Sequence, residues 1–260
     1  MKKQNPLVSI LVINYNNSKF INDCIKSLKS QTYKKIEIIF FDDNSRDNSL
    51  EVIKRFKNIK VIKNKTQTKY GSFNQINGLK KSLNRSSGKI LLLLDSDDFF
   101  IKNKVNEVVN FFLDNCNKKI VFDYPIIKKN KNRNAVKKKI NFFKTYWGYI
   151  HPTSCISLRR EYLKKILKTI NDDKFINIWI DLRILLFAKY NGDYNCLSKN
   201  LTIYRQHEGN VSSRFKKFNK LWWQRRKQAH DYFIYFMKKN KLKMKKNFDL
   251  HITKLINKFL

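Results

Sequence analysis

Residues 89–98, Lys89-Ile90-Leu91-Leu92-Leu93-Leu94-Asp95-Ser96-Asp97-Asp98, join five apolar side chains directly to three carboxylates. An uninterrupted apolar run of this length predicts a strand that is buried on both faces of a sheet. The carboxylates then lie at the carboxyl end of the strand, where open α/β sheets bind ligands. They would repel each other, and a divalent cation would neutralise them more strongly than a lysine because hard cations prefer oxygen ligands. The stretch predicts a metal-diphosphate site, and the alternative is an acidic turn that caps the next helix.

The preceding ninety residues alternate between strand-like and helix-like patterns. Runs rich in β-branched or aromatic residues predict strands at 7–13, 36–41 and 59–62, and apolar residues at helical spacing predict helices at 20–28, 50–56 and 76–83. This order predicts an α/β fold with a mostly parallel, Rossmann-like sheet flanked by helices. No Gly-x-Gly-x-x-Gly and no Walker lysine motif follows the first strand, so a metal on Asp95 and Asp97 is the expected means of holding phosphates.

The second half of the chain carries weaker signals. Residues 128–139 are dominated by Lys, Asn and Arg, and we expect a mobile loop there. The aromatic cluster Tyr146-Trp147-Gly148-Tyr149 could line a sugar face or fill the core. Asp181 is a single carboxylate in the strongly apolar stretch 175–187, where a buried Asp is costly without a partner or a role. It is either paired with a cation such as Arg183, or a general base whose pKa is adjusted by burial.

The last sixty residues are basic. Arg205 and His207 lie in a polar segment after a predicted strand, where they could meet a diphosphate. Residues 214–260 are rich in Lys and Arg interleaved with aromatic residues, so the chain is divided into a domain at 1–213 and a basic helical extension at 214–260. The extension could lie on an anionic membrane surface through residues 214–246, or it could pack its aromatic residues on the domain and solvate its lysines.

The composition limits the classes of function. The chain has 260 residues, with 56 Lys and Arg against 20 Asp and Glu, which gives a net charge of +36. This excess favours anionic partners such as nucleic acid, an anionic membrane or phosphorylated substrates, although AT-rich coding DNA would also raise the lysine content. The four cysteines are too widely spaced for a zinc module or a disulfide framework. No stretch approaches the roughly 20 apolar residues of a membrane span.

Four separated segments together resemble family-2 glycosyltransferases, which are inverting, nucleotide-sugar-dependent enzymes with the GT-A fold. The segments are residues 8–16 (VSILVINYN), 37–49 (EIIFFDDNSRDNS), 95–98 (DSDD) and 204–212 (YRQHEGNVS). Their order and approximate spacing match the family over residues 6–212. The segment at 72–78 (SFNQING) departs from the Ala-Arg-Asn-type motif that the family usually shows there.

The resemblance implies a role for each matching residue. In the family, the position of Asp43 hydrogen-bonds the nucleotide base, and the loop Asn14-Tyr15-Asn16 lines the same pocket. Asp95 then contacts ribose or metal, and Asp97 ligates a Mn²⁺ or Mg²⁺ ion that bridges the diphosphate. Asp181 matches the catalytic base, although the family more often has an acidic pair there and the preceding residue here is Ile180. His207 matches a histidine near the diphosphate and acceptor, and Lys69 is a candidate for contacts to the donor.

We therefore expect a metal-dependent inverting glycosyltransferase. It would move a sugar from a nucleotide-sugar, UDP-linked in our expectation, to a hydroxyl of a cell-surface glycan or lipid-linked saccharide. We expect it in the cytoplasm, either free or peripheral on the inner face of the membrane. The alternatives are a basic nucleic-acid-binding protein and a nucleotidyltransferase on a related sheet. A nucleic-acid partner is not expected, because consecutive acidic strand ends would repel phosphates.

Overall fold

The computed structural model describes residues 5–130, 132–136, 145–170, 174–244 and 247–260. The strands are β1 (Val8–Asn14), β2 (Ile36–Asp42), β3 (Lys60–Lys63), β4 (Ile90–Asp95), β5 (Phe99–Phe100), β6 (Ile120–Lys129), β7 (Asn132–Ala135), β8 (Ile156–Arg159) and β9 (Cys196–Gln206). The α-helices are α1 (Ser18–Lys29), α2 (Ser49–Lys54), α3 (Gly71–Arg85), α4 (Lys104–Asp114), α5 (Arg160–Thr169), α6 (Ile180–Tyr190), α7 (Lys220–Lys239) and α8 (Phe248–Ile256). Two short 3₁₀ helices span Thr153–Cys155 and Val211–Arg214.

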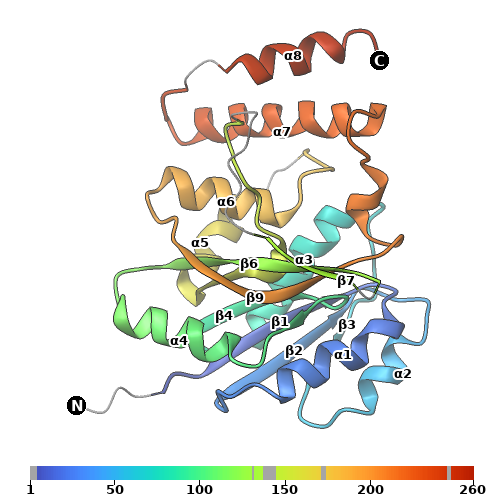
Figure 1. The fold of residues 1–260 in the computed structure, drawn as a ribbon, viewed down its shortest axis with the longest axis vertical. Helices are drawn as coiled ribbons and strands as arrows, with labels where there is room; N and C mark the ends of the chain where they lie inside the picture. Colours follow the sequence, from blue (N-terminus) through green and yellow to red (C-terminus); the bar gives the residue numbers. More distant parts are fainter. Residues whose placement is uncertain (1–4, 131, 137–144, 171–173, 245–246) are drawn as a thin grey trace.

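All of these strands join one sheet in the order β3-β2-β1-β4-β8-β6-β9-β5, with β7 paired to β6 (Figure 1). The four strands from β3 to β4 are parallel, as their alternation with helices predicts. Beyond β4 the sheet is mixed, because β8 runs antiparallel to both β4 and β6 while β6 and β9 are parallel. The predicted Rossmann-like half is thus confirmed, and a mixed half is added to it.

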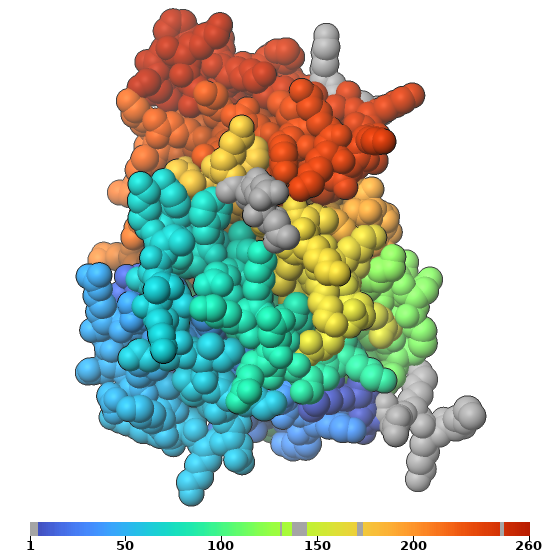
Figure 2. All heavy atoms as spheres, turned by 180° about the vertical axis from the view of Figure 1, so that it is seen from behind, coloured from blue at the N-terminus to red at the C-terminus, as the bar shows by residue number. Residues whose placement is uncertain are grey.

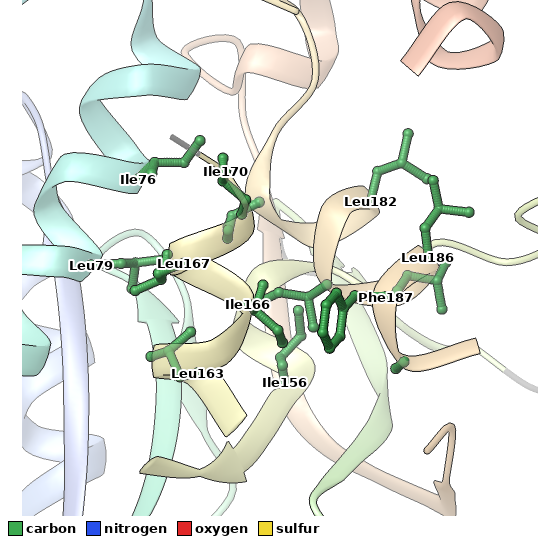
Figure 3. Packing of buried hydrophobic residues seen from close by; sticks show 14 of the residues in the cluster. Ile76, Leu79, Ile156, Leu163, Ile166, Leu167, Ile170, Leu182, Leu186 and Phe187 are labelled. Atoms are coloured by element: carbon green, nitrogen blue, oxygen red, sulfur yellow. The ribbon is translucent and has the colours of Figure 1, made fainter. Parts of the chain in front are cut away.

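Helices cover both faces of the sheet and bury alternate strand residues. Along β4, Leu91 and Leu93 pack into one core with α3, α5 and α6, whereas Leu92 and Leu94 pack into the other with α1 and α4. Figure 3 shows the first of these cores, where α3, α5 and α6 interdigitate side chains such as Leu79, Ile166 and Phe187. Because both faces are buried, the strand reads as a continuous apolar run, and the prediction of a doubly covered strand is confirmed.

The prediction of a mobile loop at residues 128–139 is wrong where the structure describes these residues. β6 continues to Lys129 and forms a hairpin with β7, with a turn at Asn130, whose φ is 54°. Residue 131 and residues 137–139 lie outside the described residues. β-Strands at an edge tolerate Lys, Arg and Asn because the ladder needs only main-chain groups and charged side chains remain in water. Composition indicated exposure here, and exposure did not prevent strand pairing.

The basic extension packs its second half on the domain. Ala229, Tyr232, Phe233, Phe236 and Met237 of α7 are buried in the same core as α5 and α6. The aromatic cluster at residues 146–149 joins this packing, since the Tyr146 and Phe233 rings stack at 4.2 Å and Trp147 is buried. These aromatic side chains therefore fill the core, and the division of the chain after residue 213 stays a prediction.

Helix α8 lies against α7 on the side away from the sheet (Figure 1), and the C-terminal residues form one end of the molecule (Figure 2). Arg226 of α7 donates to Asp249 of α8, with Nε 3.0 Å from Oδ1. Asn257 Nδ2 donates to the Trp223 carbonyl at 3.1 Å. The two helices thus run antiparallel, and the end of α8 returns to the start of α7. No helix in the described part of the chain is long and apolar enough to cross a membrane.

Candidate active site

The carboxyl ends of β1, β2 and β4 come together because of their register. Asn14 at the end of β1 pairs with Asp42 of β2, and Ile13 pairs with Asp95 of β4. The Asn14 side chain donates to Asp42 Oδ1 at 2.7 Å and accepts from Ser96 Oγ at 2.7 Å. Asn14 is buried, so we interpret it as a hub that fixes the loops after three strands, a role that the prediction of a pocket-lining residue did not include.

The second acidic group, around Asp43, forms a buried polar cluster beside this hub. Asp43 Oδ1 accepts from Asn64 Nδ2 at 2.8 Å, and its Oδ2 accepts from Gln67 Nε2 at 3.0 Å. Tyr15 is 46% exposed in the neighbouring loop after β1. Asn16 adopts a left-handed backbone with φ of 51°, and its side chain accepts from Arg46 N at 2.7 Å. Asp43, Tyr15 and Asn16 are therefore brought together, as the sequence predicts.

Lys69 lies in the loop that supplies Gln67, but its own side chain is exposed. Its Nζ sits 5.2 Å from the Tyr70 ring centroid. The loop is anchored instead by Asn74, whose Oδ1 accepts from Thr68 N at 2.9 Å. A contact from Lys69 to a donor stays a prediction.

Asp97 meets the polar segment after β9. Its Oδ2 lies 3.1 Å from His207 Nε2 and accepts from Asn210 Nδ2 at 3.0 Å. The His207 ring also packs on Phe20, with centroids 4.5 Å apart. Asp97 and His207, 110 residues apart in the chain, thus form one cluster, as the predicted diphosphate site requires.

Arg205 does not point its guanidinium into this cluster. The guanidinium forms an ion pair with Asp23 at 3.0 Å and lies over the Phe20 ring at 4.6 Å. Its main-chain N instead donates to Asp98 Oδ1 at 2.8 Å. The expected diphosphate contact from the Arg205 side chain therefore stays a prediction that would require this ion pair to open.

Asp98 does not cap the following helix, whose N-cap residue is Asn103. Asp98 is fully buried and accepts from Ser154 Oγ at 2.6 Å as well as from the Arg205 main chain. Ser154 Oγ also accepts from Asp95 N at 3.1 Å. Ser154 and Asp98 together tie the acidic strand end to β9 and the 3₁₀ turn, so they position the site rather than line it.

Asp181 lies in the first turn of α6, where its Oδ1 accepts from Leu182 N at 2.7 Å. Arg183 donates to the main-chain carbonyls of Ile178 and Phe175, not to Asp181. Gln75 of α3 connects this helix start to the acidic strand: its Nε2 donates to Asp95 Oδ1 and its Oε1 accepts from Ile180 N, both at 3.3 Å. Gln75 therefore joins the start of α6, which carries Asp181, to the acidic strand end. Burial and, to a smaller extent, the charge of Asp181 raise the pKa of Asp95.

Burial and the neighbouring carboxylates raise the pKa values of two acidic residues at the end of β4. Burial, reinforced by the charge of Asp97, raises the pKa of Asp95 to about 8. Burial also raises the pKa of Asp98 and the pKa of Asp181, and in Asp181 the charge of Arg225 partly opposes it. Within the described residues, no Lys or Arg side chain forms an ion pair with Asp95, Asp97 or Asp98. Such a cluster calls for a cation, and carboxylate oxygens are suitable ligands for Mn²⁺ or Mg²⁺.

Several residues of this site could not be identified from the sequence alone. Asn210 stands three residues after His207, and this closeness in the sequence was the accessible signal for a residue whose amide the structure places 3.0 Å from Asp97. Gln75 lies in the segment that departs from the family pattern. Ser154, Asn64 and Gln67 carry no signal in the sequence, because common polar residues in loops have many roles.

Comparison with known proteins identifies the relatives of this chain. The family model described as glycosyl transferase family 2 matches residues 9–168. An uncharacterized glycosyltransferase of Nostoc sp. is 28% identical over 220 residues, which cover 78% of this chain and 66% of that protein. An Escherichia coli protein, UDP-Glc:alpha-D-GlcNAc-diphosphoundecaprenol beta-1,3-glucosyltransferase WfaP, is 33% identical over 118 residues, or 45% of each chain.

Solved structures show the same fold. Staphylococcus aureus TarS residues 1–349, in complex with UDP-GlcNAc, matches with a TM-score of 0.65 at 19% identity, covering 86% of this chain and 65% of that one. Mannosyltransferase PcManGT of Pyrobaculum calidifontis, in complex with GDP-Man and Mn²⁺, matches with a TM-score of 0.59 at 15% identity, covering 94% and 66%. The fold is thus GT-A, and the chain spans at most about two thirds of the length of these relatives.

Proposed function

The chain belongs to glycosyltransferase family 2, and from this we propose that it is an inverting enzyme that moves a sugar from a UDP-sugar to a hydroxyl of a lipid-linked saccharide. The observation that carries the proposal is the placement of Asp95 and Asp97 between two other parts of the site. The Asp43 cluster lies at the end of β2, and Gln75 joins Asp95 to the start of α6, which carries Asp181. Donor and acceptor groups would meet over the acidic strand end.

The polar cluster around Asp43 would bind the nucleotide base. A carboxylate held by Asn64 and Gln67 is oriented before the ligand arrives, so little ordering is required on binding. The loop with Tyr15 and Asn16 would line the same binding site. TarS binds UDP-GlcNAc, and WfaP is named for a UDP-Glc donor, which supports a uridine nucleotide.

Asp95 and Asp97 would hold a Mn²⁺ or Mg²⁺ ion. Among the residues that the structure describes, no group of three or more His, Cys, Asp or Glu side chains is arranged to hold a metal ion. Two carboxylates nevertheless fit a cation that takes its remaining ligands from substrate phosphates. When bound, such an ion supplies Lewis-acid stabilisation to the charge on the leaving diphosphate. His207 beside Asp97 lies where it can donate to the same phosphates.

Asp181 would act as the general base. The acceptor oxygen attacks the anomeric carbon on the side opposite the leaving diphosphate, and the carboxylate takes the hydroxyl proton. Because one displacement inverts the anomeric centre, no enzyme nucleophile is needed. Burial raises the pKa of Asp181, which increases its basicity once it is ionised.

The decisive experiment measures released nucleotide from a panel of UDP- and GDP-sugars with Mn²⁺, for wild type and Asp97→Ala. We expect turnover of a UDP-sugar by wild type and a loss of at least about 100-fold in the variant, as for removal of a principal electrostatic group. The matched control is Asp193→Ala, which removes an acid that pairs with Lys119 far from the site. Equal activity of Asp97→Ala and wild type would refute the assignment, and no turnover of any nucleotide-sugar would refute the function.

We also propose an anionic membrane as the surface on which this enzyme meets its acceptor. The buried aromatic residues of α7 are not available to lipid, so the proposed surface comprises the start of α7 and the outer side of α8. Its exposed apolar side chains are Phe218 (66%), Leu221 (50%), Phe248 (79%), Leu255 (56%) and Phe259 (83%). Phe248 and Leu255 are seven residues apart and share one stripe of α8, opposite the buried Leu250 and Thr253. Lys254 and Lys258 accompany this stripe and suit anionic head groups.

Vesicle sedimentation tests this surface. We expect wild type to sediment with vesicles that contain phosphatidylglycerol, and Leu255→Ser with Phe259→Ser to release most of the protein. Val61→Ser, which removes a 44% exposed apolar side chain elsewhere, is the control. Unchanged sedimentation of the double variant would contradict the proposal, and a dimer that dissociates in the double variant would assign the stripe to a second copy instead.

A further inference from the structure

Helix α7 is held in a defined register against the start of α6. Gln228 Oε1 accepts from Asn177 N at 2.6 Å, three residues before Ile180. One turn further along α7, the Tyr232 ring lies under the Arg183 guanidinium at 4.8 Å. These two contacts fix which residues of α7 face α6, and both come from the part of the chain beyond the family match.

This register also determines the position of Arg225. It lies three residues before Gln228, on the same side of α7, because residues three apart are neighbours on a helix. The two contacts run in the same order along α7 and along the segment that leads into α6, so Arg225 lies beyond Gln228 on the side of the N-terminal end of α6, where Asp181 occupies the first turn. The electrostatic influence of Arg225 on Asp181 agrees with this placement.

A second element holds the Arg225 guanidinium from the other side. The guanidinium lies over the Phe215 ring at 4.6 Å. Phe215 closes the segment that begins at Asn210, whose side chain donates to Asp97. Arg225 thus lies where the segment from Asn210 to Phe215 meets α7. Stacking on Phe215 limits the orientations of the Arg225 side chain.

We propose that Arg225 binds a phosphate of the acceptor, directly next to the sugar hydroxyl that reacts. The inference rests on the proposed function and names the acceptor class: a saccharide whose anomeric carbon carries a phosphate or diphosphate. In such an acceptor the reacting hydroxyl and the phosphate lie on the same ring. A general base for the hydroxyl, Asp181, and a cation for the phosphate, Arg225, therefore have to lie close together. The donor diphosphate would instead be held at Asp97 and His207.

Arginine suits this role better than lysine would. Its planar guanidinium can bind two phosphate oxygens at once, while the face of the group stacks on an aromatic ring. Arg225 is partly exposed, so a ligand can reach it, whereas its neighbour Arg226 is already bound to Asp249. Arg225 therefore has the accessibility that a binding residue requires.

The test compares two acceptors that differ only in charge. One is N-acetylglucosamine diphosphate on a short lipid, and the other is octyl N-acetylglucosaminide, which lacks phosphate. We expect Arg225→Gln to raise KM for the diphosphate acceptor by at least about 10-fold, as for loss of a charge-assisted hydrogen bond. KM for the neutral acceptor should change by less than about 3-fold. Because the Arg225 charge also acts on Asp181, kcat should change by the same factor for both acceptors, so the ratio of the two KM changes is the readout. Arg225→Lys should recover part of the affinity.

Lys227→Ala is the matched control, because it removes an exposed positive charge two residues away on the same helix. If Arg225→Gln raises KM equally for both acceptors, or for neither, the residue supports the site without binding phosphate, and the proposal is overturned. If Lys227→Ala has the same effect as Arg225→Gln, only the general charge of α7 matters, and the proposal fails as well. The absence of any UDP-sugar hydrolysis by wild type would instead refute the proposed function.

Discussion

Lys104 is the residue whose replacement tests the site's framework most directly. It begins α4 with a fully buried side chain, and its Nζ donates to Asp123 Oδ2 (2.7 Å), the Ser154 carbonyl (2.7 Å) and Thr202 Oγ1 (2.6 Å). Through Ser154 it supports both Asp95 and Asp98. Lys104→Met keeps most of the side-chain volume but leaves the Asp123 carboxylate buried without its cation.

The expected loss follows from that uncompensated charge. Removing one partner of a buried ion pair costs about 3–5 kcal/mol, a large part of the roughly 5–15 kcal/mol that stabilises a folded domain. Urea unfolding followed by tryptophan fluorescence would show a midpoint lower by about 1 M or more, given slopes of roughly 1–3 kcal/mol/M. Lys104→Met with Asp123→Asn should recover part of this loss, because the buried charge is then removed.

Lys199→Met is the matched control, since it breaks an ion pair with Glu107 of the same 2.7 Å length in which Lys199 is 54% exposed. The exposed Lys199–Glu107 pair should contribute at most about 1 kcal/mol to the free energy of unfolding. The reasoning is refuted if Lys104→Met and Lys199→Met have equal effects. It is also refuted if the double variant is no more stable than Lys104→Met alone.

Four further predictions address the helices and the base. Gly78→Ala should destabilise the protein in thermal unfolding, although Ala is favoured in helices by about 1 kcal/mol, because its Cβ would lie 2.7 Å from Phe41 Cδ1; a higher melting temperature would contradict this. Phe233→Ala should lower the unfolding free energy by about 3–5 kcal/mol, since Phe233 is 1% exposed, whereas Phe259→Ala at an exposed position should have little effect. Asp181→Asn should reduce transfer by at least about 100-fold with unchanged UDP binding. In wild type, the raised pKa of Asp181 should shift the acid limb of the rate profile above the ordinary aspartate range, because the base must be ionised to act; a limb within that range would count against its burial.

Acidic residues that directly follow predicted strands could be placed at one edge of the sheet from the sequence. Asp95, Asp97 and Asp43 follow buried strands, and parallel strands bring their carboxyl ends to one edge of a sheet. His207 was expected near a diphosphate from its place after a predicted strand and from the family resemblance, and the structure places it on Asp97. Arg205 shows the limit of such reasoning, because nothing near it in sequence indicates that Asp23, 182 residues away, pairs with its guanidinium.

The sequence by itself determined the parallel half of the sheet and the acidic strand end, because apolar periodicity and turn residues act within a few positions of each other. The tertiary structure decided the frame around them: Ser154 on Asp95 and Asp98, Gln75 between Asp95 and α6, and α7 against the segment that leads into α6. These contacts join segments 20 to 105 residues apart and use common polar side chains, whose partners depend on packing and not on local pattern. The three carboxylates after β4 thus predicted a cation site, and only the fold showed that Asp98 belongs to its support.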